Sequence, residues 1–154
     1  MPNKAYVIFY DPDAQEFYFP IKRSGYCAGM PQFFGGTKNA GESDRDTLTR
    51  EVLEESDEKL TLKSGGLHQI HHARINEYNY NFYVSTNFSG THFLGAFKNT
   101  EMSSIVKYFV DVDSNVTDDI HDFMQRLKIS ITEEFAESET CEAFTRALAW
   151  AMED

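Results

Sequence analysis

The fold of this chain is decided by the stretch Gly36-Thr-Lys-Asn-Ala-Gly-Glu42-Ser-Asp-Arg-Asp-Thr-Leu-Thr-Arg50-Glu51-Val52-Leu53-Glu54-Glu55, whose charged and apolar residues repeat at helical spacing. At about 100° per residue, Glu51, Glu54 and Glu55 occupy roughly one third of a helix circumference. The aliphatic residues on the opposite side are Leu48, Val52 and Leu53. This amphipathic pattern predicts a helix that docks on a core. Like charges three and four residues apart destabilise an isolated helix by about 0.2–0.5 kcal/mol per pair, and a hard divalent cation such as Mg²⁺ would offset that repulsion.

A glycine-rich loop leads into this predicted helix. Gly35-Gly36 follows the apolar pair Phe33-Phe34, and Ser43 is suited to cap the helix, with Asp46 where a capping-box acid belongs. We therefore expect a strand, a loop and a helix, with the loop backbone able to approach a ligand closely. A solvated acidic face is the alternative interpretation of the glutamates, and the glycine-rich flank argues against it.

The same residues resemble the Nudix box, Gly-x5-Glu-x7-Arg-Glu-U-x-Glu-Glu-x-Gly-U, in which U is aliphatic. Every position from Gly36 to Glu55 agrees, whereas Asp57 replaces the last glycine and Glu58 replaces the last aliphatic residue. In the family this glycine commonly ends the helix in a left-handed conformation, which would cost an aspartate about 1 kcal/mol. The alternative is a helix that continues to Lys59 or Leu60.

The resemblance also implies a metal site and its supports. The implied ligands of Mg²⁺ or Mn²⁺ are Gly35 (through its backbone carbonyl), Glu51, Glu54 and Glu55. Arg50 is implied to orient the glutamates through an ion pair rather than to touch the substrate. Glu42 would be an outer ligand or a brace at the end of the loop.

The general base is assigned from the resemblance as well. Which carboxylate acts as base varies within the family, so Glu51 is the first candidate and Glu101, in a polar loop, is its rival. Asp111 and Asp113 are alternatives to Glu101, and a solvated loop acid is the other interpretation of that residue. The predicted catalytic residues are Arg50, Glu51, Glu54 and Glu101.

Cations near the box are candidates for contact with substrate phosphates. Lys22 and Arg23 end the predicted strand over 16–21, upstream of the box, in a chain with a net charge of −11. An ordinary charged strand end is the alternative. The predicted substrate-binding residues are Lys22, Arg23, Lys38 and Glu42.

The rest of the chain predicts strands on both sides of the central helix. Alternation and β-branched or aromatic content predict strands over residues 4–10, 16–21, 32–34, 67–75, 78–85, 93–97 and 105–112, the first two joined as a hairpin. Thr117 and Ser138 predict the caps of two final helices, with Trp150 at the edge of the last apolar stripe or in a self-association surface. This order of elements predicts an α/β/α sandwich around a mixed β-sheet, the fold that the Nudix resemblance also implies.

Histidines and tyrosines are weaker candidates for metal ligands and for residues that stack on a base. On a regular strand His68 and His72 share a face and His71 points the other way, and no third ligand follows at zinc-like spacing. Structural or surface histidines are therefore the preferred interpretation. Four tyrosines could stack on a base or belong to the core, namely Tyr26, Tyr78, Tyr80 and Tyr83.

Composition narrows the classes of protein further. A length of 154 residues fits a single domain over 1–154, and its acidity argues against a general polynucleotide-binding surface, although capped RNA stays among the candidate substrates. Two cysteines without C-x-x-C spacing, no leader pattern and no long apolar run favour a cytoplasmic protein away from membranes. A homodimer is a candidate assembly.

The sequence thus predicts a metal-dependent pyrophosphohydrolase. The Nudix resemblance implies a small-molecule substrate, a nucleoside diphosphate linked to another group. The chemistry is consistent with it, because divalent cations neutralise the charge of a phosphoanhydride and lower the pKa of bound water. A nucleotide-binding or sensor module without hydrolysis is the alternative, and an acidic interaction protein is a third candidate. No marker in the sequence selects the substrate.

Overall fold

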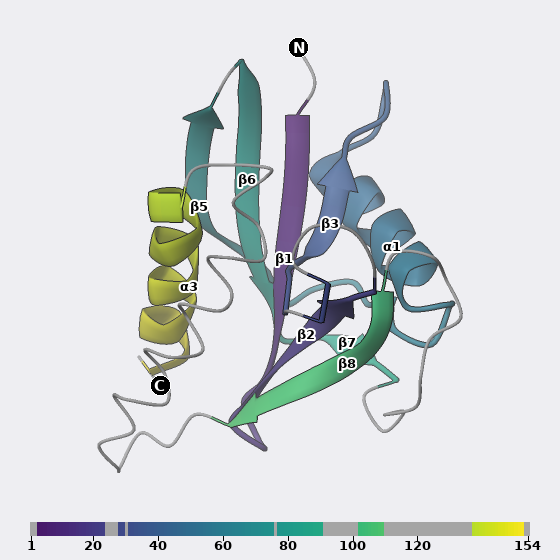
Figure 1. Cartoon of the computed structure of the whole chain (residues 1–154), viewed down its shortest axis with the longest axis vertical. Coiled ribbons are helices and arrows are strands. Elements are labelled where there is room, and N and C mark those ends of the chain that lie inside the picture. The colour runs from purple at the N-terminus through teal and green to yellow at the C-terminus, as the bar shows by residue number, and fades with distance from the viewer. Residues whose placement is uncertain are drawn as a thin grey trace.

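A computed structural model describes residues 3–23, 28–29, 31–75, 77–90, 102–109 and 137–152. Its central element is strand β1 (Asn3–Asp11), which pairs with three other strands (Figure 1). The side chains from Ala5 to Tyr10 are all buried, as expected for a strand that is covered on both faces.

The main sheet is mixed. Among the described residues it has six strands in the order β5-β6-β1-β2-β8, and β3 pairs with β1 beside this path. The further strands are β2 (Glu16–Lys22), β3 (Phe34–Thr37), β5 (Leu67–Ile75), β6 (Tyr78–Ser85) and β8 (Met102–Phe109). β1 and β6 run parallel, whereas the other pairs are antiparallel. A small second sheet pairs β4 (Thr61–Leu62) with β7 (Phe88–Ser89).

The sheet forks along one edge of β1. The first part of that edge pairs with β3, through the register Lys4↔Thr37 to Val7↔Phe34, and the last part pairs with β2 from Phe9 onwards. β2 pairs with β8 along its whole length, and from Phe19 onwards it no longer pairs with β1. Between the two branches, the Gln32 N–H donates to the Pro20 carbonyl at 2.9 Å. The chain before the glycine pair therefore lies within the fork.

Two helices cover opposite faces of the sheet (Figure 1). Successive β1 side chains point to opposite faces, so each helix has its own core. Against helix α1 (Asp44–Glu55) the apolar set includes Ala5, Val7, Phe9, Leu48 and Val52. Against helix α3 (Glu137–Met152) it includes Tyr6, Ile8, Tyr10, Ala143, Phe144 and Ala147. The predicted α/β/α sandwich is confirmed.

Helix α1 begins at the predicted cap. The Ser43 hydroxyl accepts a hydrogen bond from the Asp46 N–H, and the Asp46 carboxylate accepts one from the Ser43 N–H, both at 3.1 Å. The helix ends at Glu55, and Asp57 and Glu58 have φ values of 55° and 64°. The Glu58 N–H donates to the Leu53 carbonyl at 2.7 Å, a hydrogen bond that caps the end of the helix. Of the two expected exits, the left-handed one is present.

Several strand bounds were predicted correctly. The predicted strands over 67–75 and 78–85 match β5 and β6, and the first hairpin is β1 with β2. β3 begins two residues later than predicted, at Phe34, because the glycine pair itself supplies the pairing with β1. α3 begins at Glu137, so Ser138 lies inside its first turn rather than at the cap. The strand over 93–97 and the helix after Thr117 lie outside the described residues.

One prediction about β5 is wrong. A β-bulge between Gln69 and His71 shifts the register of β5 against β6, and an extra residue reverses the alternation of side chains beyond it. His68 and His71 consequently share the α3 face, and His72 lies on the α1 face. The His68 ring lies 5.0 Å from that of Trp150, which packs on the sheet.

None of the described helices is long and apolar enough to cross a membrane.

Glu58→Gly tests the strained exit of α1. A left-handed residue other than glycine costs about 1–2 kcal/mol, and glycine's extra chain entropy cancels about 0.5–1 kcal/mol of the gain. We expect the free energy of unfolding to rise by about 0.5–1 kcal/mol, measured by urea denaturation. Lys63→Gly is the matched control, because Lys63 is exposed without a positive φ, and it should lower stability by about 0.5–1 kcal/mol. Equal losses in both variants would contradict the interpretation.

Candidate functional site

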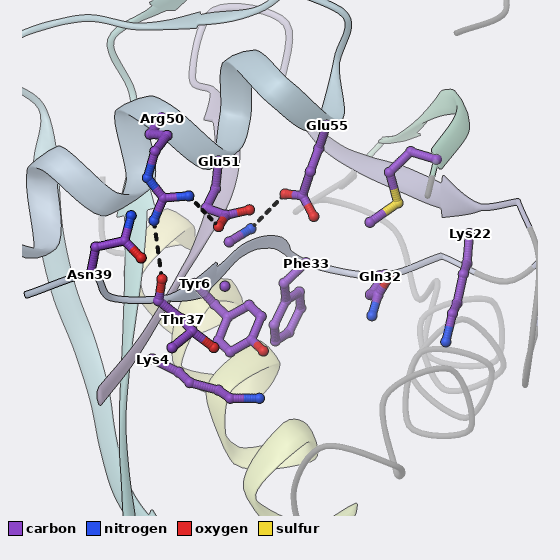
Figure 2. Close-up of a pocket in the computed structure, with 13 residues that line it drawn as sticks. Lys4, Tyr6, Lys22, Gln32, Phe33, Thr37, Asn39, Arg50, Glu51 and Glu55 are labelled. Carbon is purple, nitrogen blue, oxygen red and sulfur yellow. Dashed lines mark hydrogen bonds and ion pairs between the residues drawn. The ribbon is translucent and has the colours of Figure 1, made fainter. Parts of the chain in front are cut away.

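A cleft of about 510 Å³ lies where helix α1 meets the fork of the sheet, within the range typical of small-molecule sites. Figure 2 shows Arg50, Glu51 and Glu55 of α1 on one side of β3, and Tyr6, Phe33 and Lys4 on the other. The lining residues are Lys4, Tyr6, Lys22, Gln32, Phe33, Gly35, Gly36, Thr37, Asn39, Arg50, Glu51, Glu55 and Met102. The cleft therefore places carboxylates, two lysines and aromatic rings around one space.

The glycine pair makes the cleft sterically possible. A Cβ on Gly35, which has a φ of 144°, would lie 2.1 Å from the Ala5 carbonyl oxygen, so no other residue fits this pairing with β1. A Cβ on Gly36 would lie 2.9 Å from the Glu51 carboxylate. The Gly35 N–H also donates to Glu55 Oε1 at 2.9 Å. The buried Glu55 carboxylate is thereby held against the strand.

Arg50 joins the helix to the glycine-rich loop. Its Nε and Nη2 donate to the two carboxylate oxygens of Glu42 at 2.9 and 3.0 Å, a bidentate pair. Its Nη1 donates to Glu51 Oε1 at 2.8 Å, and its Nη2 donates to the Thr37 carbonyl at 3.1 Å. Glu54 Oε2 is more distant, at 3.7 Å. Hydrogen bonds to Glu42, followed by those to Glu51, raise the pKa of Arg50.

Glu42 is the centre of the loop's own hydrogen bonds. In addition to Arg50, two loop and helix groups donate to Glu42 Oε1. They are the Asn39 N–H at 2.8 Å and the Thr47 hydroxyl at 3.1 Å. The Arg50 hydrogen bonds come first among the causes that lower the pKa of Glu42 to about 2, and the bond from Asn39 follows. Glu42 is therefore a brace for Arg50 at the end of the loop.

Lys38 is engaged in a second network, at the N-terminus of α1. Its Nζ lies 3.2 Å from Asp44 Oδ1, and the Asn81 amide donates to Asp44 Oδ2 at 2.9 Å, as does the Tyr83 hydroxyl. Burial acts to raise the pKa of Asp44, but the hydrogen bonds from Tyr83, Asn81 and Lys38 outweigh it and the pKa is lowered. This network docks the start of α1 on β6.

The predicted site residues divide between the cleft and its surroundings. Those that line the cleft are Lys22, Gly35, Arg50, Glu51 and Glu55. Those described elsewhere are Arg23, Lys38, Glu42 and Glu54, and Glu101 lies outside the described residues. The Glu54 side chain is 62% exposed. In the described part of the chain, no three His, Cys, Asp or Glu side chains lie close enough together to hold a metal ion as they stand.

The sequence analysis missed several cleft residues, among them Lys4, Tyr6 and Gln32. Lys4 and Tyr6 are two apart on β1, and Gln32 lies in the fork. The ammonium of Lys4 lies 5.5 and 5.8 Å from the ring centres of Tyr78 and Tyr80. A charged residue within a hydrophobic central strand was the available signal, but its meaning depends on the pairing of β1 with the glycine pair.

Comparison with known proteins adds evidence on the fold. No protein-family model matches the sequence, and no curated protein matches it either. The chain is similar in structure to the E. coli ORF135 protein, with a TM-score of 0.62 and 19% identity over 100% of this chain and 95% of that chain.

Two further similar structures are named MutT. For MutT from a study of Aliivibrio salmonicida and Vibrio cholerae, the TM-score is 0.51 and the identity 21%, over 71% of this chain and 79% of that chain. For the MutT Nudix hydrolase from Burkholderia pseudomallei, the TM-score is 0.52 and the identity 12%, over 80% and 97%. The chain therefore has the fold of the MutT and Nudix proteins.

Gly35→Ala tests the close approach of β3 to β1. We expect the free energy of unfolding to fall by about 2–4 kcal/mol, because the added carbon meets backbone and the φ is unfavourable. Gly41→Ala is the matched control, because Gly41 has a φ of 82° but nothing within 4 Å of a Cβ, and it should cost only about 1–2 kcal/mol. Equal costs in urea denaturation would show that contact with Ala5 is unimportant.

Glu42→Gln tests the brace through its pH dependence. Because folding lowers the pKa of Glu42 from 4.5 to about 2, its stabilisation is complete above pH 4.5 and is lost as the pH falls towards 2. The variant should be less stable than the wild type at pH 7, and the difference should shrink below pH 4.5. Urea denaturation from pH 7 to pH 3 measures it. A difference that is the same at both ends would refute the role of the ionised carboxylate.

Proposed function

We propose that this chain is a Nudix-type hydrolase that cleaves the pyrophosphate linkage of a nucleoside diphosphate joined to another group, with Mg²⁺ or Mn²⁺. The observation that carries this proposal is the position of Glu51 and Glu55 in one cleft beside Gly35-Gly36. It is supported by a fold that is shared with a MutT Nudix hydrolase.

The oxygen donors of the cleft suit a hard divalent cation. Glu51 and Glu55 would hold the ion together with the Gly35 carbonyl. Glu54 would join them after a change of rotamer, since its carboxylate lies 3.7 Å from the guanidinium of Arg50, a residue that lines the cleft. When bound, the ion neutralises phosphate charge and lowers the pKa of coordinated water. The donor set therefore fits the ion, although the side chain of the third glutamate, Glu54, is largely exposed.

The chain's own contribution is to orient these groups before the substrate arrives. Arg50 holds Glu51 by a 2.8 Å hydrogen bond, and the Gly35 N–H holds Glu55 by one of 2.9 Å. Groups fixed in advance need no reorganisation during the reaction. Glu51 is our candidate for the base, and Glu101 is its rival.

Two cations supply attraction for an anionic substrate. Lys4 and Lys22 line the cleft of a chain whose net charge is −11. Local positive charge focuses anions into a cleft even when the whole protein is acidic. These lysines, rather than Arg23 or Lys38, are therefore our candidates for contact with the phosphates.

A nucleotide-binding module without hydrolysis is the second candidate. It is favoured by the 62% exposure of the Glu54 side chain and by the lack of a gathered acidic cluster among the described residues. Calorimetry that detects tight nucleotide binding, with no phosphate released over hours in Mg²⁺ or Mn²⁺, would support this candidate and exclude the enzyme.

Glu51→Gln and Glu55→Gln test the hydrolase. Each variant keeps an oxygen acceptor for its hydrogen bond, so we expect an intact fold and a loss of activity of about 100-fold or more. Phosphate release is measured on a panel of nucleoside triphosphates, ADP-ribose, NADH, dinucleoside polyphosphates and capped RNA, with and without EDTA.

Two further variants sharpen this test. Glu54→Gln should lose activity as well, and full activity in it alone would limit the ligands to Glu51 and Glu55. Glu142→Gln is the matched control, because Glu142 pairs with Arg146 on the exposed face of α3, and it should retain activity. Wild-type rates in both cleft variants would end the proposal.

A further inference from the structure

Gln32 is a buried polar residue of the cleft. It is 6% exposed, and its backbone N–H is used in the bond to Pro20. In the described residues no hydrogen bond engages its side-chain amide. Buried amides are nearly always paired, because an unpaired one has lost its hydration without compensation. A buried amide that lines a cleft without a partner among the described residues is available to bind a ligand.

The chemistry of a carboxamide narrows the class of ligand. It offers two N–H donors and one acceptor, which match the paired donors and acceptors on the edge of a nucleobase. A phosphate group would use only the donors. Gln32 lies between Phe33 and Lys22, away from Arg50 and Glu51 (Figure 2). A nucleotide could therefore place its phosphates at the glutamates and its base at Gln32.

We propose that Gln32 recognises the hydrogen-bonding edge of the substrate's base and so selects among nucleotides. This inference rests on the proposed function in taking the ligand to be a nucleotide, and it extends that function by assigning the residue that determines specificity. Sites built to form hydrogen bonds with a ligand discriminate strongly against ligands that leave the site's polar groups unpaired.

Gln32→Met separates this role from a structural one. Methionine has a similar volume and no amide, so it removes an unpaired buried polar group. If the amide serves only a ligand, the midpoint of thermal unfolding should rise, because replacing an unsatisfied group with an apolar one of the same shape is stabilising. A structural role would instead lower the midpoint.

The binding test uses the four nucleoside monophosphates AMP, GMP, CMP and UMP in EDTA, so that it requires neither metal nor hydrolysis. By calorimetry we expect the wild type to bind one of them about tenfold or more tightly than the others. In Gln32→Met the ratio should fall to about threefold or less. Gln69→Met is the matched control, because Gln69 is exposed on β5 and bonds to Asn81, and it should keep the wild-type ratio.

The outcomes separate this inference from the proposed function. Equal affinities for the four monophosphates, no binding at all, or selectivity that survives in Gln32→Met would each overturn the role of Gln32. Selective binding that depends on Gln32, together with no phosphate release from any substrate, would reject the hydrolase and leave the recognition role standing.

Discussion

The cleft depends first on the guanidinium of Arg50. One planar group with five donors contacts the loop through Glu42 and the Thr37 carbonyl, and contacts the helix through Glu51. Glutamates on one helix face repel each other and would otherwise move apart. Because Arg50 is fixed by a bidentate pair with a carboxylate that stays ionised, its hydrogen bond to Glu51 sets the direction of that side chain. Charged groups of the helix and of the loop are thus linked through Arg50.

The second constraint is steric, and it acts through the backbone. The fork at β1 opens the sheet, and Gly35 lets β3 approach so closely that a single added carbon would overlap Ala5. The same residue donates to Glu55. Pairing of β3 with β1 and orientation of a carboxylate are therefore consequences of one glycine. This coupling explains how a short loop can position two acidic groups of α1 against a sheet.

The departure from the Nudix pattern at the end of α1 leaves these constraints untouched. Asp57 and Glu58 adopt the left-handed conformation that glycine would adopt with less strain. The hydrogen bond from the Glu58 N–H to the Leu53 carbonyl still closes the helix. The strained residues follow Glu55, the last glutamate that lines the cleft, so the strain affects stability rather than the geometry of the cleft.

The sequence by itself determined the features that depend on neighbours along the chain. The capping box of Ser43 and Asp46, the helix that carries the glutamates, and the bounds of β6 follow from local periodicity and hydrogen bonding. Only the tertiary structure decided which glutamates face the cleft, that Lys4 and Gln32 join them, and how the bulge in β5 distributes its histidines. The physical reason is that these placements depend on pairing between distant strands, and a shift of one residue in register moves a side chain to the opposite face.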